Sequence, residues 1–441
     1  MTGNRRGLAE GRDLAAPRPP GPVAGRLRER RALLVWCGLI AFSFAAGGVL
    51  HAVGVLTIDH LPPLHARFRV LTVTLVPAAA FGAVAVAALP ALVRHGGFGR
   101  ALLLAYASAL AWTVLLAMSG DGLTDPLTHS TEYLAVLPAV GDDPLGWLAS
   151  FTERLSGYPT HVRGHPPLPV LILWALARIG LPGAFPASVL VVAVACSAMV
   201  AIALTVRSLA GEDAARRALP YLALTPASVW MATSMDALFA GAGAWGVALL
   251  VLAARRGTAR LLCAAVAGVL LGAVPYLSYG LVPYLLVPLV AGVLARVPRG
   301  RVVAALGGAV AVSAAFAVGG FLWPAGVLAT HAEWAADPGA ARPYLYFLVA
   351  DFAVLALVTG PATAVGLARS RPGPVRALVA AALVALVALD VSGVTRGEVE
   401  RIWLPYAVWT SLAAASVPGR RPLAAQAVTG LLLQALVGSP W

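Results

Sequence analysis

The residues best suited to chemistry gather in residues 119–166, a polar stretch of an otherwise apolar chain. Acidic groups come first in this stretch, and two histidines and an arginine follow them: Asp121, Asp125, Glu132, Asp142, Asp143, Glu153, His161, Arg163 and His165. A carboxylate can take a proton from an attacking hydroxyl group, and an arginine can bind phosphate through two parallel hydrogen bonds. We therefore expect this stretch to carry out chemistry or to bind a ligand.

Three more segments carry polar groups on the side of the membrane to which the topology below assigns this stretch. They are the tip at Asp236, residues 324–345, and residues 390–403, which contain Glu398, Glu400 and Arg401. Acids, histidines and arginines on one side suit an anionic substrate, because positioning and charge stabilisation are enough to displace a phosphate leaving group. Two plainer interpretations stay open: Asp236 can cap the helix that follows it, and the charges of residues 398–401 can pair with one another.

The spacing of His161 and His165 would place both on one face of a helix, where they could bind a metal. Pro166 and Pro167 follow at once, however, and proline favours the first turn of a helix. We therefore expect the helix to begin at about Pro166, with both histidines in the preceding loop as hydrogen-bond donors to a substrate or as structural residues. The sequence requires no metal and names no cofactor, although a divalent ion stays possible.

The composition predicts the fold class. Of 441 residues, 60% are hydrophobic and only 12% are charged, which excludes an ordinary soluble protein. Apolar runs of about 18 or more residues recur along the chain, as in transmembrane helices. The net charge of +13 comes from arginine alone, mostly in short loops between apolar runs, so it indicates membrane topology rather than nucleic-acid binding.

These runs predict an all-α polytopic membrane protein with about 13 spans, or 11 to 13. Residues 1–31 form an expected disordered cytoplasmic tail, and residues 32–441 one transmembrane domain of the cell membrane. Residues 119–185 are the main extracytoplasmic loop, in which 167–181 form an interfacial helix. Asp351 is the clear ionisable residue inside a predicted span, which makes it a functional candidate. The expected spans are 33–56, 70–93, 101–118, 186–206, 218–234, 237–254, 261–279, 281–296, 302–322, 346–368, 377–393, 403–418 and 423–438.

The order of these features resembles the GT-C superfamily of integral-membrane glycosyltransferases, which includes protein O-mannosyltransferases and lipid A aminoarabinose transferases. An acidic outer loop is followed by His165-Pro166-Pro167, a span, and Pro226 with Asp236 on the next outer tip. The segment Gly397–Pro405 is similar to one in actinobacterial membrane proteins of this kind. The resemblance implies a GT-C-like fold and an inverting transfer of sugar from a polyprenyl-phosphate donor to an extracytoplasmic glycan, lipid or protein.

The resemblance also implies roles for individual residues. In that family an acid of the first large outer loop is the general base, and Asp121, Asp125 and Glu132 compete for this role. Glu132-Tyr133 is the nearest match to the usual acidic pair followed by an aromatic residue, which is not cleanly present. Arg163 and Arg401 would hold the donor phosphate. The residues that would shape the sugar and acceptor site are His161, His165, Asp236, Glu398 and Glu400.

Two other classes of function compete with this one. A transporter or flippase of envelope precursors needs ionisable groups near the middle of the bilayer, and these are scarce. A non-catalytic membrane scaffold predicts outer acids that scatter over the surface instead of lining one site.

Overall fold

The computed structural model describes residues 22–56, 61–232, 234–257, 259–417 and 419–439. Helices form most of this part of the chain. Its sheet is a single antiparallel pair, β1 (Arg67–Phe68) and β2 (Val437–Gly438). The expectation of an all-α protein is therefore confirmed.

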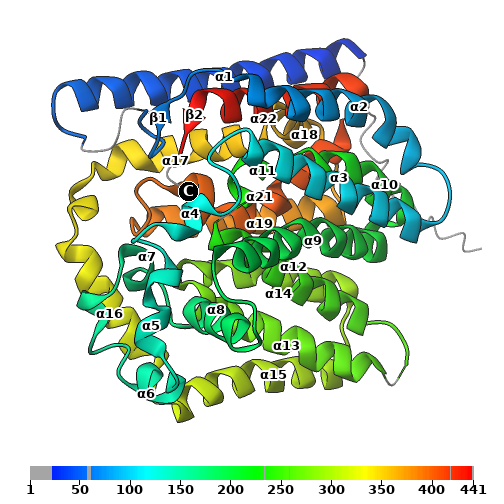
Figure 1. Cartoon of the computed structure of the whole chain (residues 1–441). Coiled ribbons are helices and arrows are strands. Elements are labelled where there is room, and N and C mark those ends of the chain that lie inside the picture. Colours follow the sequence, from blue (N-terminus) through cyan, green and yellow to red (C-terminus); the bar gives the residue numbers. More distant parts are fainter. Residues whose placement is uncertain (1–21, 57–60, 233, 258, 418, 440–441) are drawn as a thin grey trace, which may run out of the picture.

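Eight helices among the described residues are long and apolar enough to cross a membrane. Each coincides with one of the expected spans, and the chain is therefore a multi-pass membrane protein. In Figure 1 they run in the same general direction, with α1 along the top and α13 and α15 at the bottom. The eight are α1 (Pro22–Ala52), α2 (Val76–Leu92), α3 (Phe98–Met118), α9 (Ala184–Ala210), α12 (Met235–Ala253), α13 (Ala259–Leu277), α15 (Arg299–Val318) and α19 (Pro374–Val391).

Four of the other five expected spans are broken or shorter, so the expected helix lengths there are wrong, whereas the fifth, 423–438, is one continuous helix of 17 residues. For 346–368 the structure has α17 (Tyr344–Thr359) and α18 (Pro361–Arg369), bent by 100° at Gly360. Proline lacks the N–H that a helix interior needs, and Pro226 and Pro283 interrupt two more of the runs. The number of segments that cross the membrane stays a prediction. The other elements of these five runs are α10 (Glu212–Ala223), α11 (Ser228–Met231), η4 (Tyr279–Leu281), η5 (Pro283–Leu285), α14 (Leu286–Ala295), α21 (Leu404–Thr410), η7 (Ser411–Ser416) and α22 (Arg420–Leu436).

Helices α9 and α12 lie at the centre of the bundle, and α1 and α15 lie at its edge. In the most apolar window of each helix, 61% and 72% of residues are buried for α9 and α12, against 11% for α1 and α15. Small residues allow close approach between neighbouring helices, as is usual in membranes. A Cβ atom at Gly308 of α15 would lie 2.3 Å from the backbone oxygen of Ala265 in α13.

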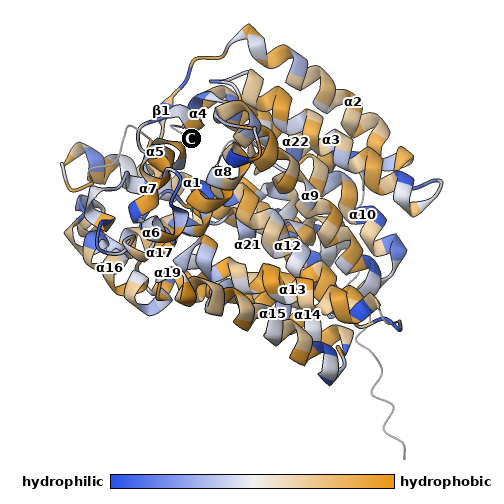
Figure 2. Cartoon of the chain, turned by 60° about the horizontal axis from the view of Figure 1, so that its bottom comes forward, coloured by the Kyte–Doolittle hydropathy of each residue, from blue (hydrophilic) through white to orange (hydrophobic). Residues whose placement is uncertain are grey.

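Short helices gather at the end of the bundle that holds residues 119–166, on the left of Figure 1. We call this the outer end, since the positive-inside rule predicts it to be extracytoplasmic. Figure 2 shows long helices mostly in orange, with blue segments at helix ends and loops. The outer elements are η1 (Val73–Leu75), α4 (Asp125–Thr128), η2 (Tyr133–Val136), α5 (Leu137–Val140), α6 (Pro144–Ala149), η3 (Leu155–Gly157), α7 (Thr160–Arg163), α8 (Leu168–Arg178), α16 (Trp323–Ala336), η6 (Pro338–Ala341) and α20 (Val399–Ile402).

One expected boundary moves, at the N-terminal tail. The tail was expected to reach residue 31, but α1 begins at Pro22, because the Arg-rich residues before the apolar run also favour a helix. Residues 1–21 lie outside the described residues. Helix α8 has 11 residues, about 16 Å, so it is too short to cross. The expectation of a separate short helix here is confirmed, and its position at the membrane surface stays a prediction.

Candidate functional site

Four segments that are far apart in the sequence meet in one largely buried group of polar side chains at the outer end. Its members come from the start of η2, the α7–α8 region, the first turn of α12, and α20. We call this group the polar cluster: Glu132, Tyr133, His161, His165, Asp236, Glu398 and Arg401. Buried polar groups need partners, so the contacts within the cluster decide what it can do.

An ion pair with three members forms the inner part of the cluster. The Nη1 atom of Arg401 lies 2.9 Å from Oδ2 of Asp236, and its Nη2 atom lies 2.8 Å from Oε2 of Glu398. Burial opposes the charge on Arg401, but the two carboxylates outweigh it and raise the pKa of Arg401. Burial also opposes the charge on Glu398, whose pKa is nevertheless lowered by Arg401 and Arg342. Arg401 and Glu398 therefore stay charged at neutral pH.

The two histidines connect the loop to the ion pair. Nδ1 of His161 lies 2.7 Å from Oε1 of Glu132, and the backbone N–H of His161 donates to the carbonyl of Thr131 at 3.2 Å. His165 places Nδ1 2.8 Å from the carbonyl oxygen of His161 and Nε2 4.0 Å from Oδ1 of Asp236. Burial lowers the pKa of His165, so this ring is neutral at neutral pH.

Tyr133 brings a hydroxyl group into the middle of these charges. Its side chain is buried, and its oxygen has no hydrogen-bond partner among the described residues. The ring lies 5.8 Å from that of His165 and 6.3 Å from that of His161. Burial raises the pKa of Tyr133, and the negative charges of Asp236 and Glu132 add to this effect. The hydroxyl group is therefore a neutral donor that can bind a ligand oxygen.

The backbone is strained where the C-terminal segment enters the cluster. Glu398 has φ 62° and ψ 13°, a left-handed conformation that residues other than glycine rarely adopt. It follows Gly397, which has φ 96°. Strain of this kind persists only where the surroundings enforce it, and it is common at functional sites. Here the left-handed conformation places the Glu398 carboxylate within hydrogen-bond distance of Arg401.

Residues from 324–345 form the rim of the cluster. Arg163 lies 3.4 Å from Glu333, and about a third of the Arg163 side chain is exposed. Arg342 donates to the backbone oxygen of Arg396 at 2.8 Å and lies 3.9 Å from Glu398. The third polar segment therefore joins the others, as the sequence suggested, although Arg342 and Tyr133 were not among the predicted site residues. The only signal for Tyr133 was its place after Glu132.

The three candidates for the base lie in different surroundings. Glu132 is buried within the polar cluster, whereas Asp121 and Asp125 are exposed. Asp125 lies 3.6 Å from His129, another exposed residue. No hydrogen bond or ion pair among the described residues joins Asp121 or Asp125 to the cluster.

One local expectation is wrong, and one interpretation that was left open is excluded. His161 lies in the one-turn helix α7, not in a loop, because Pro159 precedes that turn and favours it. Asp236 does not cap α12: Ser234 does, by accepting a hydrogen bond from the backbone N–H of Asp236 at 3.2 Å. Asp236 in the first turn is therefore available to Arg401.

Glu400, the chain neighbour of Arg401, belongs to a second group of buried acids. Glu400 is 1% exposed, and Asp351 in α17 and Asp390 in α19 are 0% and 2% exposed. Asp351 interacts electrostatically with both of the others. Asp351 was a functional candidate, and the structure gives it two acidic neighbours.

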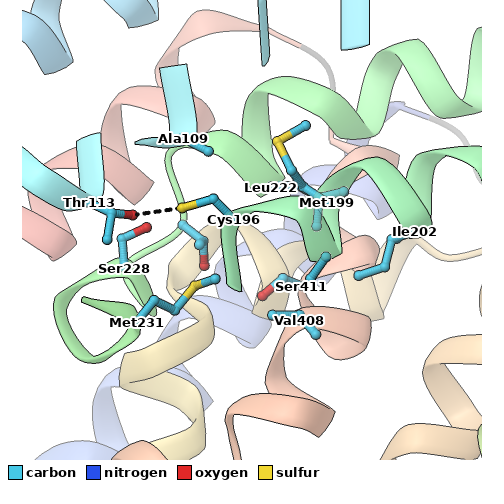
Figure 3. A pocket seen from close by; sticks show the side chains of 12 residues that line it. Ala109, Thr113, Cys196, Met199, Ile202, Leu222, Ser228, Met231, Val408 and Ser411 are labelled. Carbon is cyan, nitrogen blue, oxygen red and sulfur yellow. Dashed lines mark hydrogen bonds between the residues drawn. The ribbon is translucent and has the colours of Figure 1, made fainter. Parts of the chain in front are cut away.

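The described residues form neither a metal site nor a large pocket beside Cys196. Within the described ranges, no three side chains of His, Cys, Asp or Glu are placed to share a metal ion. Figure 3 shows a pocket near Cys196, whose thiol lies 3.6 Å from the Thr113 hydroxyl group. Its volume is about 10 Å³, room for no more than one water molecule. This pocket is too small for a substrate.

No protein-family model and no curated protein sequence matches the chain.

Proposed function

We propose that this chain is a membrane glycosyltransferase of the GT-C type. It transfers a sugar from a polyprenyl-phosphate donor to an extracytoplasmic glycan, lipid or protein, with inversion at the anomeric carbon. The observation that carries the proposal is the gathering of Glu132, His161, Asp236 and Arg401 from separate segments in one buried cluster. Structural charges are usually spread over a surface, so this gathering favours an enzyme over a scaffold.

Glu132 is the best candidate for the general base. Its contact with His161 at 2.7 Å fixes the carboxylate, and burial protects it from water. In the proposed step, the acceptor hydroxyl oxygen attacks the anomeric carbon and passes its proton to Glu132. The bond between that carbon and the phosphate oxygen breaks, and polyprenyl phosphate leaves with the electron pair.

Two arginines suit the donor phosphate in different ways. Arg163 at the rim is accessible and can fork onto a phosphate that arrives from outside. Arg401 supplies a permanent positive charge at the centre of the cluster, where a low dielectric strengthens its effect on a departing phosphate. The neutral hydroxyl group of Tyr133 can add a hydrogen bond to the same oxygens, and His165, Asp236, Glu398 and Glu400 shape the site around them.

Substitution of the three candidate acids tests this proposal. The purified full chain in nanodiscs is incubated with a panel of polyprenyl-phosphate sugars, and release of polyprenyl phosphate is followed by mass spectrometry. Glu132→Gln is expected to lower turnover by about 100-fold or more, the usual contribution of a general base. The matched controls Asp121→Asn and Asp125→Asn should keep nearly full turnover. Normal turnover of Glu132→Gln would refute Glu132 as the base, and absence of turnover for every donor would count against a transferase.

A second candidate function rests on Asp351 and Asp390. Buried acids inside transmembrane helices are typical of proton-coupled transporters, and these two interact with each other. If the chain is a transporter, dissipating the proton gradient across proteoliposomes should abolish its activity. A transferase should not respond directly.

A further inference from the structure

A groove with a basic lining lies at the other end of the bundle from the polar cluster. It forms where the end of α2, the start of α10 and the turn between η7 and α22 meet. Its volume is about 610 Å³, within the usual range of ligand sites. Four arginines line it: Arg94, Arg216, Arg217 and Arg420.

One of these arginines, Arg216, links two of the elements that form the groove. Arg216 donates to the backbone oxygens of Val93 at 2.6 Å and Gly96 at 2.8 Å, and it pairs with Glu212 at 2.6 Å. These bonds tie α10 to the turn after α2. Arg216 is therefore structural, and its charge is balanced by Glu212.

The other three arginines make no structural contacts of this kind. Arg94, Arg217 and Arg420 are exposed, and their side chains form no hydrogen bond or ion pair within the part of the chain that the structure describes. Asp213 is the one acidic residue in the lining. The groove thus presents a clear excess of positive charge.

The wall of the groove is apolar. Pro90, Val93 and Leu423 line it beside the arginines. Tyr221 lines it too, and its hydroxyl group already donates to the carbonyl of Val417 at 2.5 Å. Positive charge beside an apolar wall at the end of membrane helices suits a molecule with both an anionic and an apolar part.

We propose that this groove binds the phosphate headgroup of an anionic membrane lipid. Basic pockets between transmembrane helices at a cytoplasmic surface are suited to such headgroups, and the positive-inside rule predicts this end to be cytoplasmic. The three exposed arginines bind the phosphate, and the apolar wall takes the first part of the acyl chains. The inference is separate from the proposed transfer of sugar, since the groove and the polar cluster lie at opposite ends of the bundle.

The test combines Arg94→Gln, Arg217→Gln and Arg420→Gln in the full chain. The control combines Arg256→Gln, Arg299→Gln and Arg371→Gln, three exposed arginines elsewhere at the same end, with the same loss of charge. Dioleoylphosphatidylglycerol and dioleoylphosphatidylcholine are titrated into each detergent-purified protein, and bound lipid is counted by native mass spectrometry. Inorganic phosphate is added as a competitor in a third arm.

We expect the groove variant to bind phosphatidylglycerol about 100-fold more weakly, from roughly fivefold for each arginine. The control variant should bind like the wild type, and phosphatidylcholine should bind weakly to all three. If the combined variant does not fold, Arg217→Gln alone should lower affinity about fivefold. Unchanged binding to the groove variant, or equal loss in the control, overturns the proposal. Displacement of phosphatidylglycerol by an equal concentration of inorganic phosphate would assign the groove to free phosphate instead.

Discussion

Replacing Arg401 by glutamine should destabilise this protein more than replacing any rim arginine. Arg401 is 5% exposed, and it holds Asp236 at 2.9 Å and Glu398 at 2.8 Å. Its removal leaves Asp236 without its arginine partner, and leaves Glu398 with Arg342 alone, at 3.9 Å. Breaking a buried ion pair in this way costs about 3–5 kcal/mol of unfolding free energy. Since Arg401 serves two acids, we expect the upper part of this range.

Asp236→Asn provides the second side of a double-mutant cycle. Asparagine keeps an oxygen that can accept from Arg401, and Glu398 still balances the arginine, so the cost should be about 1–3 kcal/mol. The double variant no longer leaves a charged Asp236 unpaired. It should therefore be more stable than two independent losses predict, by about 1–3 kcal/mol.

The measurement is unfolding by sodium dodecyl sulfate in dodecyl maltoside micelles, followed by tryptophan fluorescence. Arg163→Gln is the matched control, since its contact with Glu333 is 3.4 Å long and partly exposed and should contribute less than about 1 kcal/mol. If Arg401→Gln costs no more than Arg163→Gln, or if the two losses in the cycle simply add, the buried ion pair does not support the cluster as argued.

Two further predictions concern packing and pH. Gly308→Ala should lower stability by about 1–3 kcal/mol, because its Cβ would meet a backbone oxygen of α13. The control Gly307→Ala should change stability little, since a Cβ there has nothing within 4 Å. Equal stability of the two variants in the same unfolding assay would contradict this prediction. Because burial lowers the pKa of His165, the unfolded chain binds its proton first, so stability should fall as the pH drops below about 6.5. His165→Gln should lose less stability over that window than the wild type or the exposed control His95→Gln, and identical pH profiles would show that His165 does not contribute.

The sequence predicts the membrane fold well where the apolar runs are continuous. The runs that became α9, α12 and α15 contain no interior proline, so length and hydropathy were enough. The prediction of one continuous span over 218–234 is wrong, because Pro226 separates α10 from α11. Such interruptions are tolerated in a membrane only because neighbouring helices satisfy the freed backbone groups, and a sequence does not show those neighbours.

The sequence predicts most residues of the polar cluster, but it does not show which of the three candidate acids belongs to it. Arg bias placed the polar segments together, and the structure brings Asp236 and Arg401 into contact. The choice among Asp121, Asp125 and Glu132 depended on the path of an irregular loop. That path is held by long-range contacts, such as the bond from His161 to the carbonyl of Thr131, which leave no pattern in the sequence.

The central claim is that a polyprenyl-phosphate sugar binds at the polar cluster, and photo-cross-linking tests it most directly. The full chain in nanodiscs would be irradiated with a polyprenyl-phosphate mannose that carries a diazirine on the sugar, and the labelled peptides identified by mass spectrometry. We predict labels in residues 129–167 and 395–403, which the structure brings together at the outer end, and their loss when unlabelled donor is in excess. Labels confined to the groove at Arg94, Arg217 and Arg420, or labels that excess donor does not remove, would contradict the claim.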